Sequence, residues 1–216
     1  MITRKLIGLF VFALILLSFK SDNYIIPDDY PVTNEMFKDC RTEKNIEEVF
    51  SFDKAWFKNQ ELGEVLIFEL YTDYHRSAIY HCKSDFLFSD LIKQVELHRK
   101  TGASTFDLAD EGKKQKVFKK FFDNSVEIDK SYFRTNQGIS LGICKSDAIK
   151  KYGNPSSDTA INNIIILKWD FQGDYAIAET GDKPKGKVAK DSFGFHVIMY
   201  FKLDKLVAMI LINDIP

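Results

Sequence analysis

The sequence has little cysteine and proline, no concentrated charge of either sign, and few of the short motifs that mark enzymes. It contains no Walker phosphate loop and no Gly-x-Gly-x-x-Gly dinucleotide motif. Its cysteines and histidines show no Cys-x-x-Cys or His-x-x-x-His spacing, the usual arrangement of paired zinc ligands. From these absences we expect no catalytic residues, no bound metal and no cofactor.

The basic residues do not form the concentrated surface that a nucleic-acid-binding protein needs. The chain carries 30 Lys and Arg against 31 Asp and Glu, for a net charge of −1. Its two lysine-rich runs, residues 113–120 and 183–190, lie among acidic and neutral residues. We interpret both runs as solvated surface and expect no nucleic-acid partner.

Only three cysteines occur, Cys40, Cys82 and Cys144. An odd number cannot pair completely, and one disulfide with one free thiol allows three arrangements among which spacing does not choose. We expect all three thiols to be reduced.

The first residues have the layout of a secretory signal peptide. Arg4 and Lys5 precede an apolar stretch from Leu6 to Leu17, and polar residues follow. A membrane-spanning helix needs about 20 apolar residues, so this stretch is short for a permanent anchor. We predict that residues 1–21 are a signal peptide and that the protein is periplasmic or extracellular. Retention of the segment as a membrane anchor is the alternative, because small residues are missing at the cleavage site.

Removal of residues 1–21 takes away Arg4, Lys5 and Lys20, leaving 27 basic and 31 acidic side chains, a charge of −4. The full sequence is rich in aromatic residues, with 19 Phe and 9 Tyr, which provide ample bulk for a core. We expect no transmembrane span in the chain that remains after residue 21. The predicted fold class is α+β, with antiparallel sheets, helices packed on one face, and two small two-layer halves. The halves are residues 22–111 and 112–216, joined near a loop at 101–112.

In the N-terminal half, the hydrophobic spacing predicts two kinds of element. Residues 64–71 and 77–83 alternate as two strands around a polar turn at 72–76. A helical spacing of apolar residues predicts helices at 43–57 and 88–99, and the following half begins with a helix near 117–122.

The C-terminal half reads mainly as strands. We predict them at 163–170, 175–179, 193–202 and 206–212, with the last two forming a hairpin around Leu203-Asp204-Lys205. The last strand is apolar on both faces, which predicts a central position covered on each side. One face of the strand before it gathers five large side chains, expected to point into the core: Phe193, Phe195, Val197, Met199 and Phe201.

A helix-entry pattern precedes these strands. Gly142 is followed by a short helix from about Cys144 to Tyr152 and then by Gly153-Asn-Pro155, where the glycine can adopt a left-handed stop and the proline forbids continuation. The stretch from Gly138 to Pro155 and the strands after it resemble the SmpA/OmlA-like domain of exported envelope proteins. This chain has Cys144 where that family usually has Thr or Ser. The resemblance implies an exported helix-plus-antiparallel-sheet domain used for protein contacts.

Polar residues gather at the turn between the first two strands. Asp73, His75 and Arg76 stand together there, with His81 and Cys82 a few residues on. A metal site needs three or four converging ligands, and few of these can share one side of a hairpin. The main interpretation is a polar turn with Arg76 paired to an acid. Asp73, His75 and Arg76 are the candidate ligand contacts.

A second chemical possibility involves Cys144 and His196. A thiol at a helix N-terminus is favoured as thiolate, and a histidine beside it would make a nucleophile and base. We favour a packed thiol and a hydrogen-bonded structural histidine, because no family signature surrounds the cysteine.

Together these features predict an exported, non-catalytic binding or protein-interaction protein of the cell envelope. Its partner would be another envelope or extracellular protein. The alternatives are a small secreted hydrolase or metal-dependent enzyme and an immunity or inhibitor-type protein.

Overall fold

A computed structural model describes residues 24–25, 56–71, 76–86, 122–135, 137–184 and 186–214. The predicted signal peptide, the helix at 88–99 and the boundary at 111/112 lie outside these residues. Of the helices within them, none is long and apolar enough to cross a membrane.

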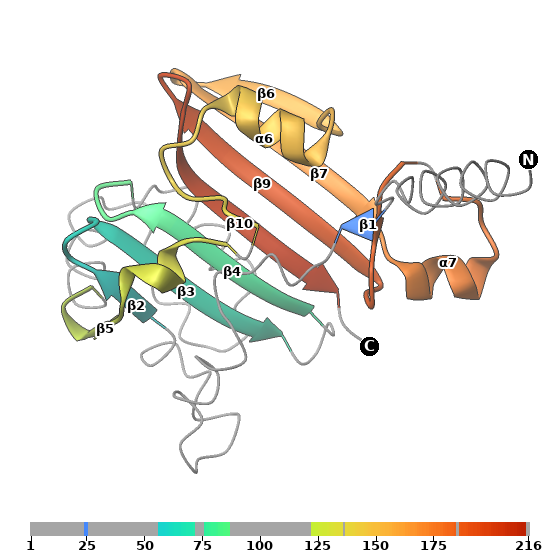
Figure 1. Ribbon diagram of the computed structural model, residues 1–216, viewed down its shortest axis with the longest axis horizontal. Coiled ribbons are helices and arrows are strands. Elements are labelled where there is room, and N and C mark those ends of the chain that lie inside the picture. Colours follow the sequence, from blue (N-terminus) through green and yellow to red (C-terminus); the bar gives the residue numbers. More distant parts are fainter. Residues whose placement is uncertain are drawn as a thin grey trace, which may run out of the picture.

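The described residues form one large, mainly antiparallel sheet and few helices (Figure 1). Its eight described strands run in the order β5-β2-β3-β4-β10-β9-β7-β6. All neighbouring pairs are antiparallel except β2 and β5, which makes the sheet mixed. The strands are β2 (Trp56–Asn59), β3 (Glu64–Tyr71), β4 (Arg76–Lys83), β5 (Val126–Glu127), β6 (Ser157–Ile161), β7 (Ile164–Gln172), β9 (Gly194–Lys202) and β10 (Lys205–Asp214). A small parallel pair, β1 (Tyr24–Ile25) with β8 (Val188–Ala189), completes the strands.

Strands from both predicted halves share this sheet. The predicted hairpin of β3 and β4 is confirmed, and β4 pairs with β10 from Cys82↔Ala208 to Arg76↔Asp214. The structure thus joins the two sets of strands in one continuous sheet where we expected two two-layer halves. The division of the chain into residues 22–111 and 112–216 stays a prediction.

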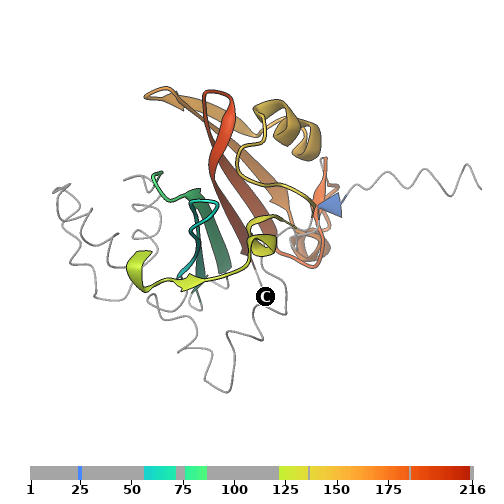
Figure 2. The same cartoon turned by 60° about the vertical axis from the view of Figure 1, so that its left-hand side comes forward.

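The helices are short. α6 (Lys145–Tyr152) confirms the predicted helix, with Cys144 as its N-cap residue. Gly153 ends it with φ 88° and ψ −165°, a region that only glycine adopts readily but that is not the left-handed helical stop expected. α6 and the short helix η3 (Lys130–Phe133) lie on the same face of the sheet (Figure 1), and Figure 2 shows the twist of the sheet beneath them.

Apolar side chains are buried on both faces of the sheet because strand residues alternate between the faces. The face that carries α6 and η3, called here the helix face, includes Leu66, Phe133, Tyr152, Trp169, Phe195, Met199 and Met209. The opposite face includes Trp56, Val65, Ile67, Tyr80, Cys82, Tyr200 and Ile210.

The predicted C-terminal hairpin is confirmed as β9 and β10 around Leu203-Asp204, and β10 lies centrally between β9 and β4. Phe195, Val197, Met199 and Phe201 are buried on the helix face, as expected. Phe193 departs from the prediction: it precedes β9, is half-buried and packs its ring 5.5 Å from that of Tyr175.

The strand predicted at 175–179 is wrong, because these residues form helix α7 (Asp174–Thr180). Two local causes outweigh the alternating pattern. Ala176 and Ala178 favour a helix, and Gly181 closes it in the left-handed conformation with φ 70°. The Asp174 carboxylate accepts hydrogen bonds from the backbone N–H groups of Asp191 and Ser192, which fixes the start of the helix against the following loop.

Two further elements were misjudged. Trp56 and Phe57, predicted to end a helix, lie in β2, where pairing with β3 sets their conformation. The rest of that predicted helix lies outside the described residues. β6 was missed, although Asn162-Asn163, both with positive φ, marks a tight hairpin turn to β7.

Candidate functional site

The structure describes one of the three candidate ligand contacts at the β3–β4 turn. Arg76 is the first residue of β4, and its Nε donates to Asp214 Oδ1 at 2.6 Å. Asp73 and His75 lie outside the described residues. Arg76 is thus paired with an acid, as the main interpretation of the turn required.

Arg76 belongs to a row of charged side chains that crosses four neighbouring strands. Asp214 also contacts His196, with 3.1 Å between Oδ2 and Nε2. The other ring nitrogen of His196, Nδ1, lies 2.7 Å from Asp170 Oδ1. The row therefore runs Arg76, Asp214, His196, Asp170 across β4, β10, β9 and β7. The sequence did not show it, because residues 138 positions apart meet only through the β4–β10 pairing.

Gly194 makes room for this row. A Cβ at Gly194 would lie 2.9 Å from Asp214 Oδ2 and 3.4 Å from His196 Nε2. A larger residue there would displace the carboxylate that links His196 to Arg76.

The row uses both nitrogens of the His196 ring. A neutral imidazole donates from one nitrogen only, so donation to both carboxylates requires the doubly protonated ring. A general base needs a nitrogen that can take a proton from a substrate. In this geometry each nitrogen already faces a carboxylate, which suits a structural histidine.

A second polar cluster is buried on the helix face. Glu64 lies between His81 and Lys83, with 2.7 Å from Oε2 to His81 Nε2 and 2.6 Å from Oε1 to Lys83 Nζ. His81 is fully buried, and the Phe133 ring lies edge-on to it at 5.6 Å. Its Nδ1 has no hydrogen-bond partner among the described residues. Lys83 is one-third exposed at the edge of this cluster. We name Glu64, His81 and Lys83 the buried triad, after the buried Glu64 and His81.

Burial and pairing shift both pKa values of the triad downward. Loss of solvent lowers the pKa of His81 below 6.5, and this outweighs the stabilising contact with Glu64. Burial alone would raise the pKa of Glu64, but hydrogen bonds from His81 and Lys83 and the nearby positive charge hold it below 4.5. The consistent state is a neutral His81 that donates from Nε2 to an ionised Glu64, which also pairs with the Lys83 ammonium.

The triad makes stability sensitive to acid. In the unfolded chain His81 takes up a proton below about pH 6.5, whereas in the folded chain its pKa is lower. The free energy of unfolding therefore decreases as the pH falls below about 6.5. Glu64 acts in the same direction below pH 4.5, because its folded pKa is also lowered. We expect the free energy of unfolding in urea to fall between pH 7 and pH 5, by up to about 1.4 kcal/mol per pH unit for one proton.

His81→Gln is the matched variant, since an amide can still donate to Glu64 but does not titrate. Its free energy of unfolding should depend less on pH in this range. Parallel pH profiles for the two proteins would contradict the assignment of neutral His81.

The two described cysteines do not pair with His196. Cys82 and Cys144 are free thiols, and burial raises the pKa of Cys82 far above its usual range. Cys144 forms an isolated backbone β-bridge with Lys205, and Lys205 pairs with Lys202 at the end of β9. Lys202 is six residues from His196 along β9, a distance of about 20 Å. Cys144 and His196 are therefore too far apart to act together. Cys40 lies outside the described residues.

The sequence contains one enzyme-like motif where we expected none. Residues 138–142 read Gly-Ile-Ser-Leu-Gly, which has the Gly-x-Ser-x-Gly spacing of a nucleophile elbow. That elbow joins a strand directly to a helix. Here Ser140 lies in a loop, and its two neighbours, Ile139 and Leu141, are buried in the core. Helix α6 begins only at Lys145. The structural context of the motif is thus different from that of the hydrolases.

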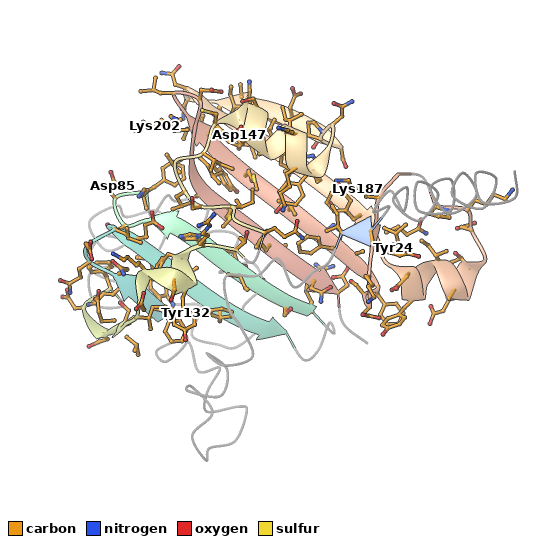
Figure 3. All side chains as sticks on the ribbon, in the orientation of Figure 1. Tyr24, Asp85, Tyr132, Asp147, Lys187 and Lys202 are labelled. Carbon is orange, nitrogen blue, oxygen red and sulfur yellow. The ribbon has the colours of Figure 1, made fainter. Side chains whose placement is uncertain are left out.

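The most unusual surface lies at the opposite end of the sheet from the charged row. Leu203, at the tip of the β9–β10 hairpin, is 88% exposed and has φ 50°. Figure 3 labels the adjoining Lys202 at this end. Lys202 pairs with Ile164, which begins a half-exposed group of isoleucines on the face opposite α6. We name this group the isoleucine strip: Ile161, Ile164, Ile166 and Ile198.

Comparison with known protein families, with curated proteins and with solved structures gives no match. The likeness of residues 138–155 to the SmpA/OmlA-like domain therefore stays a prediction. Within the described residues, no group of three His, Cys, Asp or Glu side chains converges as metal ligands would. The apolar end, meaning Leu203 with the isoleucine strip, is the candidate functional site.

Proposed function

We propose that this is an exported, non-catalytic protein that binds another envelope or extracellular protein through its apolar end. The observation that carries the proposal is Leu203, a leucine exposed to solvent in a backbone conformation that leucine disfavours. Features that cost stability without a packing gain are typical of functional sites.

The cost of Leu203 can be judged against a second turn in the same sheet. Tight hairpin turns with positive φ at both positions favour Asn and Gly. The β6–β7 turn follows this rule with Asn162 and Asn163, whereas the β9–β10 turn has Leu203 and Asp204. The left-handed conformation costs most side chains about 1 to 2 kcal/mol. A partner that covers Leu203 would give this residue a favourable role.

The chemistry of the partner follows from the surface around the strip. Ile161 is 46% exposed, and its strip neighbours are half-buried, so burial by a partner would remove further apolar area from water. Exposed Lys168 and Lys202 pair with strip residues on the same side of the sheet. A complementary protein surface would therefore be apolar at its centre and acidic at its rim.

Two features support a role other than catalysis. Both nitrogens of His196 face carboxylates, and Cys144 lies about 20 Å from that histidine along β9. Export is supported by the sequence of residues 1–21, and the SmpA/OmlA-like resemblance favours protein contacts.

The test is Leu203→Asn, which should separate stability from binding. Asn is better suited to positive φ, so we expect the free energy of unfolding to rise by about 0.5 to 1 kcal/mol. Loss of a buried leucine should weaken binding by about 1.5 to 3 kcal/mol, which is roughly tenfold or more. The measurements are urea unfolding and quantitative capture of one mass-spectrometrically identified partner from the envelope fraction.

Asn162→Gly at the neighbouring turn is the control, since it keeps positive φ and removes no apolar side chain. It should leave capture unchanged. If Leu203→Asn captures the same partner as well as the wild type does, Leu203 is not part of a binding site and the proposal fails.

A further inference from the structure

The two ends of the described sheet differ in how they stop. At one end β5 has two residues, and a strand this short offers little backbone for further pairing. At the other end β6 has five residues, all with exposed side chains. In the described part of the chain β6 pairs with β7 alone.

β6 has few of the features that keep sheet edges from pairing. Natural edge strands are blocked by lysine, proline, bulges or very short length. The β6 sequence is Ser-Asp-Thr-Ala-Ile, with one acid as its only charge and no proline, and its register with β7 is regular. Its second edge is therefore suited to accept another strand.

We propose that the second strand is β6 of another copy of this chain, paired antiparallel about Thr159. A two-fold axis through Thr159 places Thr159 opposite itself, Asp158 opposite Ala160 and Ser157 opposite Ile161. No like charges face one another in this register, and directly opposed threonines are a favourable pair in sheets. The pairing is isologous, so it closes as a dimer and leaves no new open edge.

The neighbouring registers are less favourable. Two copies that keep the α6 side of the sheet in common can shift only in steps that preserve the alternation of side chains. A centre on Asp158 places two carboxylates opposite each other, which is destabilising. A centre on Ala160 brings in Asn162, which has positive φ in the β6–β7 turn and cannot continue a strand.

The Thr159-centred register also joins surfaces already described. Thr159 pairs with Ile166 of the isoleucine strip on the same face. In the dimer the isoleucine strip of one copy would continue into that of the other. Ile166 and Thr159 of one copy would be followed by Thr159 and Ile166 of the second copy. The pairing of five-residue strands is a small interface, so we expect a weak, concentration-dependent dimer.

Disulfide trapping tests the register. In a Cys40→Ser, Cys144→Ser background, Thr159→Cys should oxidise to a covalent dimer, because opposed Cβ atoms lie about 4.5 to 5.5 Å apart. Ser157→Cys is the matched control on the same face of the same strand. Its two copies would be four residues out of step, about 13 Å, and should not cross-link. Equal cross-linking of the two variants, or none by Thr159→Cys, would overturn the proposal.

Light scattering after size exclusion gives an independent reading on the uncross-linked protein. Thr159→Lys places two positive charges opposite each other and should lower the dimer fraction about tenfold or more. Ser157→Lys, which faces Ile161, should change it less. Equal effects of the two lysines would contradict the register, and these outcomes do not depend on Leu203 or on the capture of any other protein.

Discussion

Replacement of Phe195 by alanine is expected to lower the free energy of unfolding by about 3 to 5 kcal/mol, a large share of the stability of a typical domain. The Phe195 side chain is fully buried on the helix face, and its ring stacks on Phe171 at 6.2 Å. Phe195 lies on β9, between two neighbouring strands, and pairs with Phe171 of β7 and with Asn213 of β10. The cavity left by the missing ring has little freedom to collapse.

Urea unfolding of the purified variant measures this loss. Lys168→Ala, an exposed position on β7, is the control and should change stability by no more than about 0.5 kcal/mol. A loss below about 1 kcal/mol for Phe195→Ala would mean that the side chain is not packed as the structure shows.

Glu64→Ala should also destabilise the protein, with an expected loss of about 1 to 3 kcal/mol, because it leaves a buried hydrogen-bond donor without its acceptor. The Glu64 carboxylate is buried and satisfies both His81 and Lys83. Its removal leaves the buried Nε2–H of His81 without its acceptor, whereas Lys83, one-third exposed, still donates to the Leu62 carbonyl at 3.3 Å. The measurement is urea unfolding at pH 7, where Glu64 is ionised and His81 is neutral in the folded protein.

Two comparisons separate the triad from ordinary surface charge. Glu61→Ala removes an exposed partner 3.8 Å from Lys130 and should cost no more than about 0.5 kcal/mol. The triple change Glu64→Leu, His81→Leu, Lys83→Met replaces the whole triad by apolar groups and should recover much of the loss, because no buried polar group is left unpaired. If Glu64→Ala were as mild as Glu61→Ala, the triad would not be buried in solution.

Local sequence patterns were enough to predict the helices and strands whose conformation depends mainly on neighbouring residues. The alternation from Glu64 to Lys83 predicted β3 and β4, and the same signal predicted the β9–β10 hairpin. Gly153 and Pro155 predicted the end of α6. The central position of β10 also followed, because a strand that is apolar on both faces must be covered on both.

The candidate site was less accessible to the sequence. The polar turn drew attention to Asp73, His75 and Arg76, while the buried triad lay within the same hairpin. Its signal was present, because the register of the turn places Glu64 opposite Lys83, with His81 on the same face. Leu203 was recognised only as a turn residue, since exposure and φ are properties of the folded chain.

Local sequence patterns were sufficient to place β3, β4, α6, β9 and β10 and to assign which of their side chains share a face. The contacts between distant segments depend on how these elements pack together. Pairing of β4 with β10 brings Arg76 to Asp214, and placement of β6 at the end of the sheet leaves its backbone edge and the isoleucine strip exposed. The physical reason is one of range. Hydrophobic periodicity and the residues that end helices and strands act over a few positions, whereas strand order depends on which surfaces bury the most apolar area together.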